Sequence, residues 1–238
     1  MSMLRLLAGW SCRCCYDMKR PSGTSARPAQ DAKRRDCREE SGPVRIACLG
    51  DSNTVGGGLG KTGSYPAQLQ RHLNEEAGMG TFVVKPFGVN GAVAVATPGK
   101  KCYEHQQRCA DAAAFAPHIF VVMLGTNDAW HRAGEPQKVG DSIMALLDRL
   151  EKARSPLPLN RRCPFFLVLP PGAKDGRLRD NLAQHVHPEL RRVAKARADT
   201  TLVDVLVSSD GYRPDAVHLS KQGAGQVASS VATAILRS

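Results

Sequence analysis

Aromatic residues are scarce in this 238-residue chain, since Phe, Trp and Tyr together make up only 5% of the sequence. Proteins that bind single-stranded nucleic acids stack bases on aromatic side chains, so this scarcity argues against a nucleic-acid partner despite a formal net charge of +11. A run of eighteen apolar residues is also lacking, which argues against a membrane-spanning helix. The positive charge instead favours a general attraction to anionic surfaces or substrates.

The histidines lack the spacing of a metal site. His131, His185 and His187 have no carboxylates near them at ligand spacing, so we expect no metal and no other cofactor. The glycine-rich stretch Gly56–Thr62 resembles a phosphate-binding loop, but Val55 occupies the position where that loop requires its first glycine. We therefore interpret the stretch as a mobile rim beside a pocket.

The eight cysteines are scattered along the chain and do not suggest a disulfide framework. Cys48 lies in an apolar run and Cys163 just before another, so we expect both to be small core residues. Cys102 and Cys109 can form a disulfide only if the segment between them is not one continuous helix. Such a helix would separate the two residues by about 10 Å.

The first 42 residues differ in composition from the rest. They hold nine Lys or Arg against five Asp or Glu, and their short apolar patch Met3–Trp10 is interrupted. We expect residues 1–42 to be a disordered or targeting leader and residues 43–238 to be the folded domain. An Arg-rich, acid-poor start is typical of an organellar transit peptide. An untargeted tail on a cytoplasmic protein is the alternative, and the sequence leaves both open.

The densest basic segment of the folded part is Arg191–Arg197. It continues an apolar stripe that includes Leu190 and Val193, so we interpret it as a solvated helix face and not as a surface that reads nucleic acid.

Short apolar runs alternate with stretches of helical periodicity beyond residue 43. The apolar runs predict five strands: Val44–Leu49, Phe82–Phe87, Ile119–Leu124, Phe165–Leu169 and Thr201–Val205. Helical stripes separate or follow them: Tyr65, Leu69 and Leu73; Ile143, Leu146, Leu147 and Leu150; Leu182, Val186, Leu190 and Val193; and Val227, Val231 and Ile235. Strands that are apolar on both faces and separated by helices indicate a parallel sheet covered on both sides. We therefore predict an α/β fold, a three-layer α/β/α sandwich with a five-stranded parallel sheet.

Four short blocks of polar residues and glycine carry the chemistry. They are Gly50–Thr54, Phe87–Gly91, Gly125–Asp128 and Asp215–His218, and the first three follow predicted strands. Each alone has an ordinary interpretation as a turn or a helix cap. Together and in this order they supply a serine nucleophile, oxyanion donors and a histidine with a carboxylate to orient it, so they predict a serine hydrolase.

The blocks resemble those of the SGNH (GDSL) hydrolases, a family named for its Ser, Gly, Asn and His. The resemblance covers roughly residues 44–236 and implies a flavodoxin-like fold. It also implies that Ser52 is the nucleophile, His218 the general base and Asp215 its orienting carboxylate. The oxyanion donors would be the backbone N–H groups of Ser52 and Gly91 and the side-chain amide of Asn127.

Details of the blocks refine this resemblance. The stretches Gly63–Gln70 and Ala114–Asp128 look most like the carbohydrate acetylesterase and arylesterase branches. The last block continues with Leu219 and Ser220 where many members have Pro-Asn, and the second has Asn90 before its glycine where Ser is frequent. Gly88 remains an alternative to Gly91 as backbone donor.

We expect a serine esterase that hydrolyses short-chain acyl esters, acetyl esters above all, of a small molecule or a carbohydrate through an acyl-enzyme intermediate. Short chains are expected because the sequence has no long apolar insertion to line a lipid channel. Two alternatives use the same fold. An O-acyltransferase would pass the acyl group to a sugar or small alcohol, and a noncatalytic module would only bind. The sequence discloses no subsite for an acceptor alcohol, which the transferase would need. None of the four blocks is broken, as would favour the noncatalytic module.

Overall fold

The computed structural model describes residues 42–131, 135–157 and 163–238. The predicted leader, 1–42, lies outside this part of the chain except for its last residue, so its role stays a prediction.

Five parallel strands form the central sheet in the order β2-β1-β5-β6-β7. They are β1 (Val44–Gly50), β2 (Phe82–Gly88), β5 (Ile119–Met123), β6 (Phe165–Val168) and β7 (Thr200–Val203). This confirms the predicted sheet, with strand ends shifted by one or two residues. After β1 the chain forms β2 at one edge of the sheet, and it later returns to form β5 on the other side of β1. Open sheets of this order bind ligands outside the carboxyl ends of the two strands where the winding reverses, here β1 and β5.

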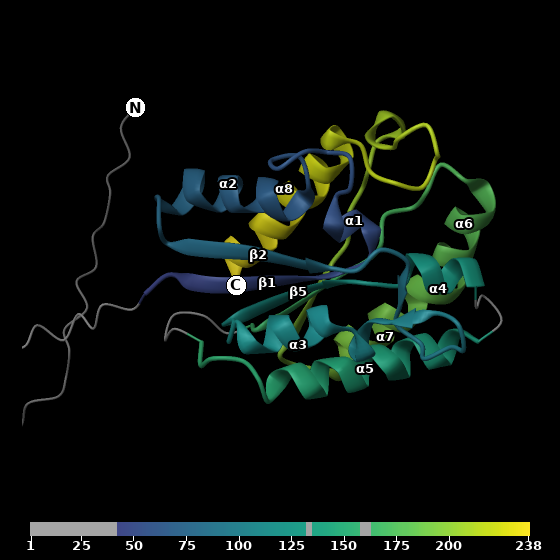
Figure 1. Cartoon of the computed structure of the whole chain (residues 1–238), viewed down its shortest axis with the longest axis horizontal. Helices are drawn as coiled ribbons and strands as arrows, with labels where there is room; N and C mark the ends of the chain where they lie inside the picture. The colour runs from purple at the N-terminus through teal and green to yellow at the C-terminus, as the bar shows by residue number, and fades with distance from the viewer. Residues whose placement is uncertain (1–41, 132–134, 158–162) are drawn as a thin grey trace, which may run out of the picture. The chain divides into compact units, whose positions relative to one another are not determined.

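Helices cover both faces of the sheet (Figure 1). The helices of the described residues are α1 (Ser52–Val55), α2 (Tyr65–Ala77), α3 (Gln107–Ala114), α4 (Thr126–His131), α5 (Pro136–Glu151), α6 (Gly176–Asn181), α7 (His187–Ala196) and α8 (Lys221–Arg237), with short helical turns η1 (Tyr103–His105), η2 (Leu182–Val186) and η3 (Ser209–Gly211). None of them is long and apolar enough to cross a bilayer. The helices α2 and α8 lie on one face, and α3, α5 and α7 lie on the other, which confirms the three-layer sandwich.

Each strand contributes side chains to two separate apolar cores because successive residues point to opposite faces. In β1, Ile46 and Cys48 pack with the α2 and α8 side chains, whereas Ala47 and Leu49 pack with those of α3 and α5. All four are fully buried. Strands buried on both sides need continuous apolar sequence, which is the pattern from which the sheet was predicted.

The segment after β2 contains a small sheet that the sequence did not reveal. Two short parallel strands, β3 (Ala92–Val93) and β4 (Lys101–Cys102), pair beside the site described below. A helical break at Gln106 separates η1 from α3, so Cys102 and Cys109 do not share one helix. Both cysteines are nevertheless free and buried, as are Cys48 and Cys163.

The apolar stripe from Leu182 to Val193 is buried as predicted but does not form a regular α-helix. Between α6 and α7 the turn η2 is a π-helix, in which the N–H of His187 donates to the carbonyl of Leu182, five residues back. The next residue, Pro188, has no N–H to donate, which weakens α-helical pairing at this point.

The basic segment after Leu190 is tied to acidic groups of the same chain. Arg191 pairs with Asp204, and Arg192 pairs with both Asp141 and Glu189. The expected solvated face fits these two exposed residues.

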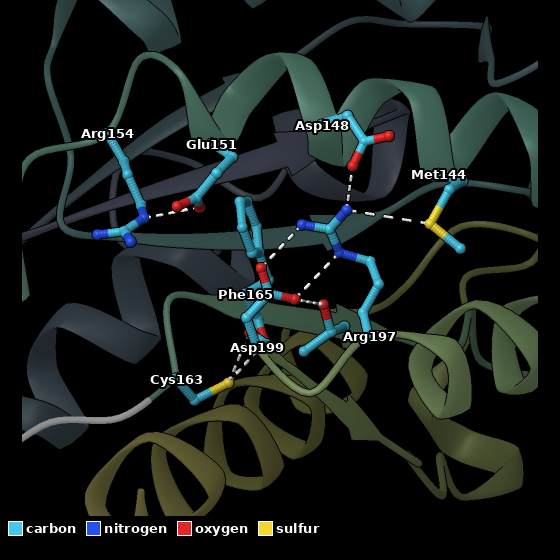
Figure 2. A network of polar contacts seen from close by, with 9 residues as sticks. Met144, Asp148, Glu151, Arg154, Cys163, Phe165, Arg197 and Asp199 are labelled. Carbon is cyan, nitrogen blue, oxygen red and sulfur yellow. Dashed lines mark hydrogen bonds and ion pairs between the residues drawn. The ribbon is translucent and has the colours of Figure 1, made fainter.

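For Arg197 the interpretation as part of a solvated face is wrong. It lies just past α7, with only 13% of its side chain exposed. Its guanidinium donates two hydrogen bonds of 3.0 and 2.8 Å to the carboxylate of Asp199. It also donates a hydrogen bond to Asp148 (Figure 2). It lies 5.4 Å from the centre of the Phe165 ring. Arg197 is therefore part of the packing between α5, α7 and β6.

Candidate active site

The four sequence blocks meet at the carboxyl edge of the sheet. Ser52 begins α1 directly after β1, Asn127 lies in the first turn of α4 after β5, and His218 lies on the loop before α8. A cavity of about 530 Å³ opens between them. Its walls are formed by Ser52, Gly57, Gly58, Asn90, Gly91, Asn127, Arg213 and His218.

Hydrogen bonds connect Ser52, His218 and Asp215 in one line. The hydroxyl of Ser52 lies 3.0 Å from Nε2 of His218, and Nδ1 of the same ring lies 2.9 Å from Oδ2 of Asp215. An ionised carboxylate only accepts hydrogen bonds, so the neutral ring carries its proton on Nδ1. Nε2 is then left to accept the proton of Ser52.

Asp215 is held in its charged form. Its Oδ1 accepts the backbone N–H groups of Val217 at 3.0 Å and His218 at 2.8 Å. Partial burial works against the charge, yet these two N–H groups and the imidazole together keep the pKa of Asp215 below its ordinary value.

The loop that carries His218 is fixed to the rest of the site by its backbone. The N–H of Arg213 donates to the carbonyl of His218 at 2.8 Å, and Tyr212 pairs with Leu219 in an antiparallel bridge. The N–H of Leu219 donates at 2.9 Å to the side chain of Asn53, which is buried beside the serine. Sequence reasoning missed this role of Asn53, because nothing local marks a residue whose partner is 166 positions away.

Two backbone N–H groups beside the serine are available to a ligand. Those of Ser52 and Gly91 donate to no group in the described part of the chain. Gly91 lines the cavity with a φ of +74°, whereas Gly88 packs against the serine turn, where an added Cβ would come within 2.6 Å of the Val55 nitrogen. The geometry therefore favours Gly91 over Gly88 as a donor.

The first turn of α4 positions the segment that carries Gly91. The side-chain amide nitrogen of Asn127 donates one of its two protons to the carbonyl of Ala92 at 2.9 Å, so the second proton is left for another acceptor. This side chain thus donates, whereas a helix cap would accept.

Asp128 is the neighbour that sequence reasoning considered only as a cap. It is fully buried and accepts the N–H groups of Ala94 and Val95 at 2.9 to 3.0 Å. Burial raises its pKa, and the two N–H groups oppose that rise. Its place in the third block, which follows the buried strand β5, was the available signal.

Asp51 lies beneath the serine and is also buried, with 1% of its surface exposed. Its Oδ1 caps α1 by accepting the N–H of Asn53 at 2.9 Å, while its Oδ2 has no partner among the described residues. Burial raises the pKa of Asp51 from 3.8 to about 6.

A second cavity of about 320 Å³ adjoins the first on the far side of His218. The two share Asn127 and His218, and the second is walled by Thr126, Asn127, Trp130, His131, Leu178, Asp215, Val217 and His218. Trp130 is 48% exposed there. An ester bound at Ser52 therefore has room in the first cavity and, beyond Asn127 and His218, in the second.

Across the described ranges, no three His, Cys, Asp or Glu side chains gather as a metal site would require. The expectation that no metal or cofactor takes part stays a prediction.

Known proteins resemble this chain in sequence and in fold. An acetylxylan esterase from Xylanibacter ruminicola is 29% identical over 213 residues, which cover 81% of this chain. The chain spans 43% of the length of that relative. Among solved structures, a carbohydrate acetylesterase family member from Sinorhizobium meliloti superposes with a TM-score of 0.57 at 21% identity, over 81% of this chain and 97% of that one. An acetylxylan esterase from Geobacillus stearothermophilus superposes with a TM-score of 0.60 at 17% identity, over 82% and 95%.

The solved structures establish the fold, and a wider sequence comparison establishes the family. Residues 48–225 match the GDSL-like Lipase/Acylhydrolase family, a span that contains all four blocks. The chain therefore belongs to this family of carboxylic ester hydrolases.

Proposed function

We propose that the protein is a serine esterase that removes short acyl groups, acetyl above all, from an alcohol. The observation that carries this proposal is the line of hydrogen bonds from Ser52 through His218 to Asp215, which opens onto a cavity with free N–H donors. An unactivated serine hydroxyl is a weak nucleophile at neutral pH, and a neutral imidazole at 3.0 Å is the base that activates it.

In the first half of the reaction, the Ser52 oxygen attacks the ester carbonyl and its proton passes to Nε2 of His218. The carbonyl oxygen becomes an oxyanion, which accepts hydrogen bonds from the N–H groups of Ser52 and Gly91 and from the Asn127 amide. Each such donor contributes about 3 kcal/mol in the transition state. When the tetrahedral intermediate collapses, His218 returns the proton to the leaving alcohol and the acyl group remains on Ser52.

In the second half, water takes the place of the alcohol. His218 accepts a proton from the water as the water attacks the acyl-enzyme, and the same donors stabilise the second oxyanion. Collapse releases the carboxylic acid and restores the Ser52 hydroxyl. Asp215 remains ionised throughout, since its role is to hold the ring with Nε2 toward the serine.

The acetyl preference rests on two considerations. Two acetylxylan esterases resemble this chain, one in sequence and one in fold. The cavity lined by Ser52 and the one that adjoins it at Asn127 and His218 have volumes of about 530 and 320 Å³ and are open, and the described residues include no long apolar insertion that would line a channel for a lipid chain.

A series of p-nitrophenyl esters from acetate to octanoate tests the reaction and its acyl preference. We expect kcat/KM to be highest for acetate and propionate. Ser52→Ala should remain folded, lose labelling by a fluorophosphonate probe and lower kcat by several orders of magnitude. Ser229→Ala changes an exposed serine on α8 and serves as the control, with full labelling and activity. Full labelling of Ser52→Ala would refute the assignment of the nucleophile.

A further inference from the structure

The larger cavity beside Ser52 has a cationic wall formed by Arg213. Apart from His218, every other residue of that wall is uncharged, being serine, glycine or asparagine. Asp215, the acid nearest in the chain, contributes to the wall of the second cavity and not of this one.

The arginine is held in a defined place. Its Nη1 donates to the carbonyl of Gly57 at 2.8 Å, and a Cβ added at Gly58 would lie 3.0 Å from Nη2, so the guanidinium rests against a loop without side chains. Its backbone is bonded to the carbonyl of His218. The cation is therefore fixed relative to the residue that would protonate the leaving alcohol.

Arg213 has no acidic partner in the described part of the chain. The arginines of the basic segment, Arg191, Arg192 and Arg197, are all paired with carboxylates. A guanidinium carries five N–H donors, and the carbonyl of Gly57 accepts only one of them. A second cation lies at the rim, where Nζ of Lys101 is 3.3 Å from the carbonyl of Asn90.

We propose that Arg213 binds a carboxylate carried by the alcohol part of the substrate. The inference rests on the proposed esterase function and deepens it, since it names the class of substrate as acetyl esters of acidic alcohols. A planar guanidinium matches the two oxygens of a carboxylate, which forms charge-assisted hydrogen bonds with it. If the acyl group is acetyl, it has no site for a charge, so the carboxylate belongs to the alcohol.

Two pairs of aryl acetates isolate the effect of this charge. They are 3- and 4-acetoxyphenylacetate, each compared with the corresponding acetoxyphenylacetamide. A methylene group separates the charge from the ring, so the two phenol leaving groups of a pair are nearly alike. We expect kcat/KM to favour the acid of at least one pair by about tenfold, as one charge-assisted contact provides. The preference should shrink as salt rises from about 0.02 M to 0.5 M.

Variants at Arg213 separate charge recognition from support of the glycine loop. Arg213→Met should bring the ratio between acid and amide to about one. Arg213→Lys should retain part of the preference, because it keeps the charge but loses the planar fork. Arg237→Met removes the same charge at the last residue of α8, a helix that begins three residues after His218 and is about 25 Å long, and should leave the ratio unchanged.

The outcomes are distinct. Wild-type enzyme that hydrolyses p-nitrophenyl acetate but treats acid and amide alike would overturn the inference and leave the esterase function standing. An Arg213→Met variant that slows both substrates equally would also overturn it, because the residue would then only support the loop. Preference for a charged acyl group, as in a succinate half-ester, without preference for the charged alcohol would refute the assignment to the alcohol. An enzyme inactive on every ester would overturn both proposals.

Discussion

Replacement of Asp51 by Asn should stabilise the protein at neutral pH but not at acidic pH. Asp51 is buried beneath Ser52, one of its oxygens has no hydrogen-bond partner among the residues that the structure describes, and burial raises its pKa to about 6. Between pH 3.8 and 6 the folded protein therefore binds a proton more tightly than the unfolded chain does. Stability contributed by the protonated carboxyl is full below about pH 4 and is lost as pH rises through 6. Asparagine has no charge to bury, so it escapes that loss.

The size of the effect follows from the shift. Moving the pKa from 3.8 to about 6 is a change of about two units, and each unit corresponds to about 1.4 kcal/mol. The difference in unfolding free energy between Asp51→Asn and wild type should grow by about 2.5 kcal/mol from pH 4 to pH 7 and then remain level. The side-chain oxygen of Asn can still accept the N–H of Asn53, so the cap of α1 is retained.

Urea denaturation of both proteins at half-unit intervals between pH 4 and pH 8 measures this difference. Asp175→Asn is the matched control, because Asp175 caps α6 by accepting the N–H of Leu178 but is only partly buried. The variant removes a capping carboxylate in the same way but outside the core, so a rise in relative stability with pH that is confined to Asp51→Asn reports the burial of the Asp51 carboxyl. Stability curves for Asp51→Asn and wild type that run parallel across this range would show that the buried carboxylate costs nothing, and the reasoning would be refuted.

Three further changes test the site and the leader. Asp215→Asn should lower kcat by about a thousandfold or more with little change in melting temperature, because an amide nitrogen facing Nδ1 would donate to the ring and favour the wrong tautomer; near wild-type turnover, with His218→Ala inactive, would show a dyad instead. Asn127→Ala should lower kcat by about a hundredfold and cost about 1 kcal/mol of stability through the lost bond to Ala92; intact kcat would exclude an oxyanion role. A chain beginning at Pro43 should match the full chain in melting temperature and kcat/KM, and a loss in either would show that residues 1–42 support the domain.

The layered fold was predictable because its cause is local. Runs such as Ile119–Leu124 are short and apolar at every position, and a strand covered on both faces buries all of them. The order of the blocks along the chain then places them at one edge of the sheet, because parallel strands end on the same side.

The rest of the site depends on contacts between distant residues. From the sequence alone, either Gly88 or Gly91 could be the backbone oxyanion donor. The two are distinguished by the backbone of the serine turn, which packs against Gly88. The sequence around Asp128 and Arg213 does not indicate their partners. Asp128 binds a loop about 34 positions away, and Arg213 binds a glycine 156 positions away. Arg197 was misread for the same reason, because its acceptor Asp148 lies on another helix.

The order of the site residues along the chain has a consequence for biosynthesis. All five strands of the sheet precede Asp215 and His218, while Ser52 follows the first of them. A nascent chain can thus complete its sheet and expose the serine while the histidine is still within the ribosome. The loop then docks by the bond from Leu219 to Asn53, and α8 packs against α2 to close that face. Hydrolytic competence therefore arrives only after His218 has left the ribosome, so a chain cut short before this residue carries an inert serine.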